Sequence, residues 1–249
     1  MSKLSRRLHL RERVKLGLRL GAHKSGIAIG RDPYVNRLVR TLEHRGVDTV
    51  LDIGANVGQF ARLLRSAGFL GNIVSAEPLA EAFGELAKRS RKDPRWEAIN
   101  SAVGAAPGTA TINVSANSYS SSLLPIMYEH LHAAPDSKVI GTEEVALTTV
   151  AEIVAKRGLR PGSTLLKVDT QGFEREVLEG AGSLIDHIDS IQLELSFVEL
   201  YEGQDLFNDV LRKMHEHGLE LWSLETGISD DVGRLLQCDG LFVRQGSIR

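Results

Sequence analysis

One stretch of the chain, VLDIGANVGQF at residues 50–60, restricts the fold more than any other. Its apolar first half predicts a buried strand, and the glycines at positions 54 and 58 predict a tight turn that lets the backbone approach a ligand. Phe60, Leu63 and Leu64 then fall on one face of a helix that stops near Gly68. A strand, a glycine-rich turn and a helix in this order indicate a parallel sheet with a ligand site above the turn.

The same alternation of strands and helices continues through most of the chain. A helix is expected to begin at Asp32-Pro33 and end at Gly46. Apolar runs predict strands at 49–53, 73–77, 96–103, 109–114, 145–148, 165–169, 190–196, 219–224 and 241–244. No linker or repeat divides the chain. We therefore expect one α/β domain over residues 32–249, with a mainly parallel sheet and a ligand site at the carboxyl ends of its strands.

Composition excludes several classes of protein. Hydrophobic residues make up 42% of the 249 residues and charged residues 25%, which excludes wholesale disorder. A net charge of −2 argues against a surface that binds nucleic acid all over. The single cysteine, Cys238, excludes an internal disulfide and a multi-cysteine metal cluster. Because no apolar run is long enough to span a bilayer and no secretory core follows the basic start, a cytoplasmic location is expected.

Residues 1–31 form a separate basic amphipathic segment. Within residues 1–24, eight lysines and arginines stand against one acid, Glu12, and leucines at positions 4, 8, 16 and 20 follow one helical stripe. One interpretation is a helix lying on anionic lipid or an arm touching nucleic acid. The other, which is commoner, is a helix packed on the domain with its charges solvated. Peripheral membrane contact through residues 1–24, at the inner face of the membrane, therefore stays an alternative.

The turn after the first strand favours one cofactor. Its spacing is G-x-N-x-G, whereas dinucleotide sites use G-x-G-x-x-G. Asp52 would oppose a pyrophosphate but favour a sulfonium or an ammonium group. Glu77 closes the second strand 19 residues after Gly58, about where doubly wound folds place a ribose-binding carboxylate. We therefore expect S-adenosylmethionine rather than NAD, bound by Asp52, Gly54, Asn56, Gly58, Phe60 and Glu77; the alternative is a tightly packed turn without a ligand.

Two sequence blocks resemble the FkbM-type methyltransferases. The first is the stretch at residues 50–60 with Ala76-Glu77-Pro78 after it. The second is LKVDTQGFE at 166–174 followed by VLEGA at 177–181, where the family reads K-x-D-x-E-G-x-E and V-L-x-G-A. The similarity runs from about residue 48 to residue 197. It implies a Rossmann-like class I methyltransferase domain that modifies hydroxyls of sugars and polyketides, with a seven-stranded sheet, helices on both faces and an antiparallel C-terminal strand.

The resemblance also assigns further site residues. Ser101 and Ala102 lie at the strand end that the family places beside adenine. Gln171 stands where the family usually has Glu, and it is assigned to acceptor binding.

Methyl transfer to an alcohol requires a base that lies close to the acceptor oxygen. Asp169 closes the fourth core strand and is the first candidate, although a carboxylate there can also cap a helix. Glu194, inside the fifth strand, is the second. A polar insertion at about residues 115–140 is expected to cover the acceptor, with His130 as a third catalytic candidate and Ser120 and Ser121 as acceptor ligands. A divalent metal held by Asp169 and Glu194 is an alternative outside the predicted site, which contains no metal.

The sequence thus predicts an S-adenosylmethionine-dependent O-methyltransferase that acts on a sugar-containing small molecule or a glycolipid. A nucleic-acid methyltransferase that uses the basic arm is the first alternative. It is disfavoured because the fourth strand ends in Asp-Thr-Gln-Gly, not in an Asn/Asp-Pro-Pro-aromatic platform for a flipped base. A binding module without turnover is the second alternative, and the intact acid and glycine set of the turn argues against it. No sequence signal specifies an oligomeric state.

Overall fold

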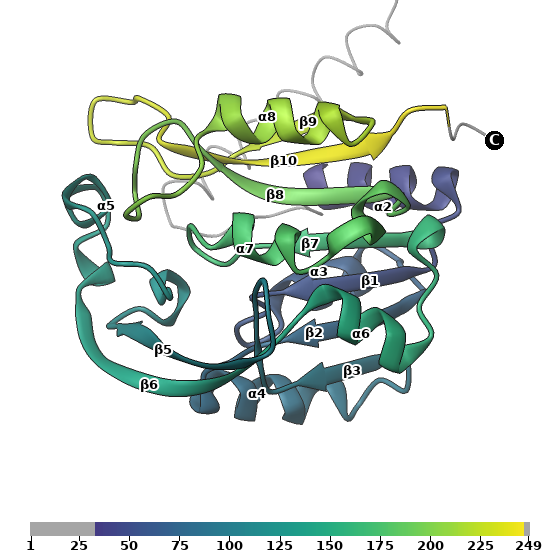
Figure 1. The fold of residues 1–249 in the computed structure, drawn as a ribbon, viewed down its shortest axis with the longest axis horizontal. Helices are drawn as coiled ribbons and strands as arrows, with labels where there is room; N and C mark the ends of the chain where they lie inside the picture. Colours follow the sequence, from purple (N-terminus) through teal and green to yellow (C-terminus); the bar gives the residue numbers. More distant parts are fainter. Residues whose placement is uncertain (1–32, 247–249) are drawn as a thin grey trace, which may run out of the picture.

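The computed structural model describes residues 33–246. The basic segment 1–31 and the helix cap expected at Asp32 lie outside the described residues. Figure 1 shows a central twisted sheet with helices on both faces and a curved pair of strands extending from one end.

Seven strands form the central sheet: β1 (Thr49–Ile53), β2 (Asn72–Ala76), β3 (Trp96–Ile99), β7 (Thr164–Val168), β8 (Ser190–Ser196), β9 (Leu219–Thr226) and β10 (Gln237–Arg244). Their order is β3-β2-β1-β7-β8-β10-β9. Pairing is parallel from β3 through β8, and β10 is antiparallel to both β8 and β9. The predicted fold class, a mainly parallel sheet with an antiparallel C-terminal strand, is confirmed.

Helices cover both faces of this sheet. One face packs against α2 (Pro33–Arg45), α3 (Gln59–Ser66) and α4 (Ala80–Ser90). The other packs against α6 (Val150–Arg157), α7 (Glu174–Glu179), the short 3-10 helix Gly182–Asp186 and α8 (Phe207–Glu216). Because both faces are covered, the central strands read as almost continuous apolar runs.

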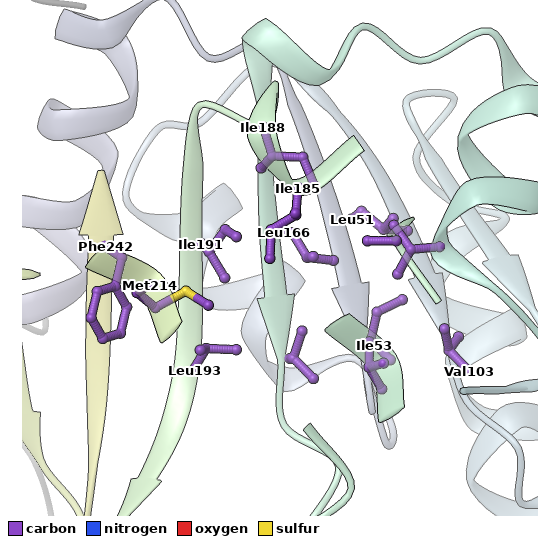
Figure 2. Packing of buried hydrophobic residues seen from close by; sticks show 14 of the residues in the cluster. Leu51, Ile53, Val103, Leu166, Ile185, Ile188, Ile191, Leu193, Met214 and Phe242 are labelled. Carbon is purple, nitrogen blue, oxygen red and sulfur yellow. The ribbon is translucent and has the colours of Figure 1, made fainter. Parts of the chain in front are cut away.

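Alternation along β1 distributes its side chains between the two cores. Val50 packs with the α2 and α3 side, whereas Leu51 and Ile53 join the larger cluster under α6, α7 and α8. Figure 2 shows this larger cluster, in which Leu166 and Leu193 of the neighbouring strands lie between β1 and Met214 of α8. The arrangement fixes the carboxyl ends of β1 and β7 side by side, since Ile53 is in register with Val168.

A second, smaller sheet was not foreseen. The strand predicted at 96–103 is wrong in extent, because it breaks after β3 and only β4 (Ala102–Val103) continues, in a separate sheet. β4 pairs with β6 (Val139–Thr148), and β6 pairs antiparallel with β5 (Gly108–Ser115). The predicted insertion at 115–140 is therefore a loop at 116–138 between two long strands, with α5 (Tyr128–Ala133) and two 3-10 turns (Ser118–Ser120 and Pro135–Ser137).

Packing explains both glycines of the turn after β1. Gly54 has a positive φ of 75°, and a Cβ there would lie 1.9 Å from the backbone oxygen of Asp169. Gly58 has a φ of 82°, and its Cβ would lie 2.6 Å from the Trp96 ring. The turn thus packs closely against β7 on one side and against β3 on the other.

Among residues 33–246, no helix combines the length and the apolarity needed to cross a bilayer.

Candidate functional site

A cavity of about 290 Å³ opens at the carboxyl ends of the central strands, close to the lower end of the roughly 300–1,000 Å³ typical of small-molecule sites. Its walls come from the turn after β1, the end of β2, the start of β4, the insertion, the ends of β7 and β8, the segment after β9 and the start of β10. Polar lining residues include Asn56, Gln59, Glu77, Ser101, Ser120, Ser121, Ser122, Asp169, Thr170, Gln171, Glu194 and Asp239. The predicted position of the site, at this edge of the sheet, agrees with the cavity.

Glu77 forms one end of the cavity. Its side chain is almost fully buried, and each carboxylate oxygen accepts a backbone N–H: Oε2 from Asn56 at 2.8 Å and Oε1 from Leu79 at 3.0 Å. Burial is the main cause that raises the pKa of Glu77 to about 7, and the two N–H groups act against it. The remaining lone pairs of a carboxylate held in this way can accept hydrogen bonds from a vicinal diol.

The turn beside Glu77 contributes two amide side chains. Asn56 adopts a left-handed backbone conformation with φ of 47°, and its Oδ1 accepts the N–H of Val57. Gln59, the first residue of α3, lines the cavity and has a buried Oε1 without a hydrogen-bond partner among the described residues. A buried oxygen without a partner can accept a hydrogen bond from an N–H group of a ligand. Sequence reasoning missed Gln59, although its place directly after the glycine turn was the available signal.

Three predicted cofactor residues do not line the cavity. Asp52 lies fully buried in β1, where Ser75 Oγ donates to its carboxylate at 3.1 Å and Lys167 Nζ lies 3.3 Å away. Phe60 is buried, with its ring centroid 5.4 Å from the same ammonium nitrogen. Gly58 contacts Trp96 instead. The structure thus corrects the direct role given to Asp52, because its charge faces Lys167 below the floor of the cavity.

Ser101 and Ala102 do line the cavity, at the start of β4. The Ser101 hydroxyl lies within hydrogen-bond distance of two backbone oxygens, those of Ala102 at 2.8 Å and Ala146 at 3.0 Å. These contacts hold the second sheet against the end of β3, so this wall consists of backbone and small side chains.

The opposite end of the cavity is acidic. Asp169 lies just beyond the end of β7, and its Oδ2 is 3.1 Å from the Nζ of Lys167. Lys167 is itself buried; burial alone lowers its pKa, but the nearby Asp169 and Asp52 carboxylates outweigh this effect and raise the pKa above its ordinary value. A charged ammonium group therefore lies beneath Asp169 and links it to Asp52.

Glu194 and Asp239 also line this acidic end. They occupy opposite positions in the antiparallel register of β8 and β10. Burial, reinforced by the nearby Asp169 carboxylate, raises the pKa of Glu194 well above its ordinary value. The same two causes raise the pKa of Asp239 to about 6. Burial of several acids in one place thus raises the pKa values of Glu194 and Asp239, whereas Asp169 lies beside the Lys167 ammonium group.

Gln171 lines the cavity between these carboxyl groups. Its Nε2 donates to Asp169 Oδ1 at 3.0 Å and to Glu194 Oε2 at 2.7 Å. Its Oε1 accepts the hydroxyl of Tyr201 at 2.6 Å. Every polar atom of the amide thus has a partner within the protein, and the assignment of Gln171 to acceptor binding stays a prediction.

His130 is buried away from the cavity, which contradicts its predicted role as a base. Its Nε2 lies 3.0 Å from the Ser137 hydroxyl and 3.3 Å from that of Ser120, and its ring packs edge-on against Tyr201. Burial lowers the pKa of His130 and so favours the neutral ring. His130 holds the insertion together, and the other insertion histidine, His132, stacks on Tyr128 at the surface.

The serines of the insertion face the cavity as expected. Ser120, Ser121 and Ser122 all line it, together with the exposed ring of Tyr119, which the sequence did not single out. The Ser121 Oγ accepts the N–H of Ser115, and Ser122 Oγ donates to the backbone oxygen of Gln171. Both serines therefore anchor the insertion as well as lining the site.

No group of three or more His, Cys, Asp or Glu side chains within residues 33–246 is arranged to hold a metal ion. Between Asp169 and Glu194, the place that a bridging cation would take is filled by the Gln171 amide nitrogen.

Comparison with known proteins gives one family. The model described as the methyltransferase FkbM domain matches residues 52–221, more than two thirds of the chain. No curated protein matches significantly. Similar solved structures include the methyltransferase FkbM from Methylobacillus flagellatus KT, with 14% identity over 80% of this chain and a TM-score of 0.47. This chain covers 44% of that protein.

Another similar structure is the magnesium protoporphyrin IX methyltransferase from Synechocystis PCC 6803 with bound SAM, with 11% identity, a TM-score of 0.46, and coverage of 85% of this chain and 78% of that one. A third is a putative RNA methyltransferase from Pyrococcus horikoshii, with 11% identity, a TM-score of 0.44, and coverage of 85% and 82%.

Proposed function

The chain belongs to the FkbM methyltransferase family, and from this premise we propose that it transfers a methyl group from S-adenosylmethionine to a hydroxyl oxygen of a sugar-containing acceptor. The observation that carries the proposal is the layout of one cavity: Glu77 lines it directly after β2, and Asp169 and Glu194 line it from β7 and β8, on the other side of β1 in the sheet. The Glu77 side suits an adenosine diol, and the other side suits an alcohol that must lose a proton.

The cofactor end fits the chemistry of the proposed cofactor. Glu77 would accept hydrogen bonds from the ribose hydroxyls, and the unpaired Oε1 of Gln59 would accept one from the α-ammonium group. Gly54 and Asn56 allow the backbone to approach, and the small residues Ser101 and Ala102 leave room for a flat base. When bound, S-adenosylmethionine supplies an electrophilic methyl group on a sulfonium.

Ligand affinity should depend on pH through Glu77. Because the pKa of Glu77 is raised to about 7, the carboxylate that accepts ribose hydroxyls is fully formed only above that pH. We expect the Kd of S-adenosylhomocysteine to be constant at alkaline pH and to rise by up to about tenfold per pH unit below about pH 7. Calorimetric titrations from about pH 5.5 to 8.5 would measure this.

A Glu77→Gln variant is the control, since it cannot ionise. Its Kd should be weaker and nearly independent of pH. A wild-type Kd that stays flat across the same range would contradict the assignment of Glu77.

At the acceptor end, the chain has to place a hydroxyl and remove its proton. Placing the oxygen about 3 Å from the methyl carbon, in line with the bond that breaks, is the main requirement. Asp169 supplies negative charge next to that oxygen as positive charge develops on it. Glu194, in its ionised form, receives the proton, because a buried carboxylate with a raised pKa is a stronger base than an exposed one.

The lining of the cavity supports an acceptor that is partly apolar. The exposed ring of Tyr119 lines the cavity, together with the apolar side chains of Ile112, Leu123 and Phe173. Exposed apolar groups gathered at a site often mark an apolar ligand or an interface. Together with the acidic, hydroxyl-rich interior, these apolar groups favour a glycolipid over a free sugar as the acceptor, and a glycolipid acceptor would require contact with a membrane surface.

Transfer of label from S-adenosylmethionine tests this proposal. Purified protein would be incubated with labelled cofactor and fractionated host lipids, polysaccharides and RNA. We expect label in a lipid fraction that releases a methylated sugar on acid hydrolysis. Label in RNA would instead support a nucleic-acid methyltransferase. Cofactor binding without transfer to any fraction would support a binding module.

A further inference from the structure

Hydrogen bonds restrain both the backbone and the side chain of Gln171. Its backbone is left-handed, with φ of 56°, a conformation that non-glycine residues seldom adopt. The Glu174 carboxylate holds the surrounding turn by accepting the N–H groups of Thr170 at 2.9 Å and Gly172 at 3.3 Å. The Gln171 carbonyl accepts the Ser122 hydroxyl at 2.6 Å. Strain of this kind persists only where the surroundings impose it, so the position of the side chain is well determined.

The amide of Gln171 can point in only one way. Carboxylate oxygens accept hydrogen bonds, so the NH₂ group must face Asp169 and Glu194, to which its two N–H bonds go. The amide oxygen then faces the Tyr201 hydroxyl, which donates to it. One nitrogen therefore sets the separation of the two carboxyl groups that flank the acceptor end of the cavity.

Tyr201 joins this amide to the insertion. Its side chain is fully buried, and its hydroxyl also lies 3.3 Å from the backbone oxygen of Ser120. Its ring packs against His130, the residue that holds the insertion together. The seating of the insertion over the acceptor and the orientation of the amide thus depend on the same tyrosine.

We propose that Gln171 is a positioning residue that, oriented by Tyr201, holds Asp169 and Glu194 in the geometry needed to take the acceptor proton, and so links the seating of the insertion to the carboxyl pair. The catalytic part of this inference rests on the proposed function. The amide acts as a neutral donor to both acids: without its N–H, the ionised form of Glu194 loses a stabilising hydrogen bond.

The test uses Gln171→Met, which keeps the length of the side chain and removes its hydrogen bonds. In the protein without cofactor, ¹³C NMR of labelled glutamate side chains would follow the titration of Glu194. We expect its midpoint to move to higher pH by about one unit. The pH profile of kcat should move the same way, so that activity lost at neutral pH returns in alkaline buffer. KM for the acceptor should change less than kcat.

Tyr201→Phe provides a second variant, should Gln171→Met fail to fold. Tyr201→Phe should move the Glu194 titration and the pH profile of kcat in the same direction as Gln171→Met, but by a smaller amount. The double variant should match Gln171→Met alone, since both substitutions act through the Gln171 amide. Gln204→Met is the matched control. This glutamine accepts the N–H groups of Leu200 and Tyr201 but touches neither carboxyl, so the Glu194 titration should stay in place.

An unmoved Glu194 titration in Gln171→Met, or a loss of kcat that is equal at every pH, would overturn the proposal. The NMR titration needs neither cofactor nor acceptor, so its failure is distinct from a failure of the proposed methyl transfer.

Discussion

Replacing Asp169 with Asn should lower kcat by about 10²–10⁴-fold, the range usual for removal of a group that assists proton transfer. The change removes the negative charge beside the acceptor oxygen but keeps the shape of the side chain. Lys167 retains Asp52 as a counterion at 3.3 Å, so we expect the fold to survive. Cofactor affinity should change by less than about threefold, because Glu77, at the far end of the cavity, carries that binding. Single-turnover kinetics and calorimetry would separate the two effects.

Two variants of the neighbouring acids complete this experiment. Glu194→Gln should also lower kcat strongly, since it removes the group that we expect to receive the proton. Asp239→Asn should change kcat by less than about tenfold, because Asp239 lines the cavity but does not touch the Gln171 amide. Equal activity in Asp169→Asn and wild type would remove Asp169 from the catalytic group.

Replacing Glu77 with Ala should raise the Kd of S-adenosylhomocysteine by about 10²-fold. Hydrogen bonds to a charged group contribute about 1.5–3 kcal/mol each, and the variant loses those to the ribose. It also frees the N–H groups of Asn56 and Leu79, which the carboxylate now holds at the edge of the cavity. Isothermal titration calorimetry at alkaline pH would measure the loss.

Glu143→Ala is the matched control for this variant. Its carboxylate likewise accepts a backbone N–H from the start of α4, that of Ala80 at 3.0 Å, but Glu143 does not line the cavity. The Kd of S-adenosylhomocysteine for Glu143→Ala should stay within about twofold of the wild-type value. An equal rise in Kd for the two substitutions would mean that Glu77 affects binding only by holding the backbone before α4, and not by contacting the ligand.

Local sequence signals predicted the frame of the site well. The apolar run at 49–53, the glycines at 54 and 58 and the acid at 77 correctly predicted β1, the turn and the carboxylate at the end of β2. The fifth strand was predicted with the bounds that β8 has, Ser190–Ser196. These features depend on burial and backbone conformation over a few residues, which the sequence reports directly.

Interactions set by strand register were not predictable in this way. Asp52 was assigned to the cofactor because it precedes the turn, yet it is in register with Lys167 of β7 and points below the cavity. A strand that is buried on both faces gives no periodicity to show which face an acid takes. Lys167 itself was visible in the sequence block at 166–174, but its partners belong to other strands.

The insertion shows the same limit over a longer distance. His130 was interpreted as a residue of a polar loop, whereas contact with Tyr201, 71 positions further along, buries it. Likewise β4 and β6 pair across more than 40 residues to form the second sheet, so the strand predicted at 96–103 could not be divided correctly from local pattern alone. Tertiary contacts override local signals at such places.

A crystal structure of the protein with S-adenosylhomocysteine tests the central claim most directly. We predict density for the ligand along residues 54–56, with both ribose oxygens within about 3.2 Å of the Glu77 carboxylate and the sulfur facing Asp169. Ligand bound elsewhere on the protein, or a cavity closed by the chain's own side chains at saturating ligand, would contradict the claim.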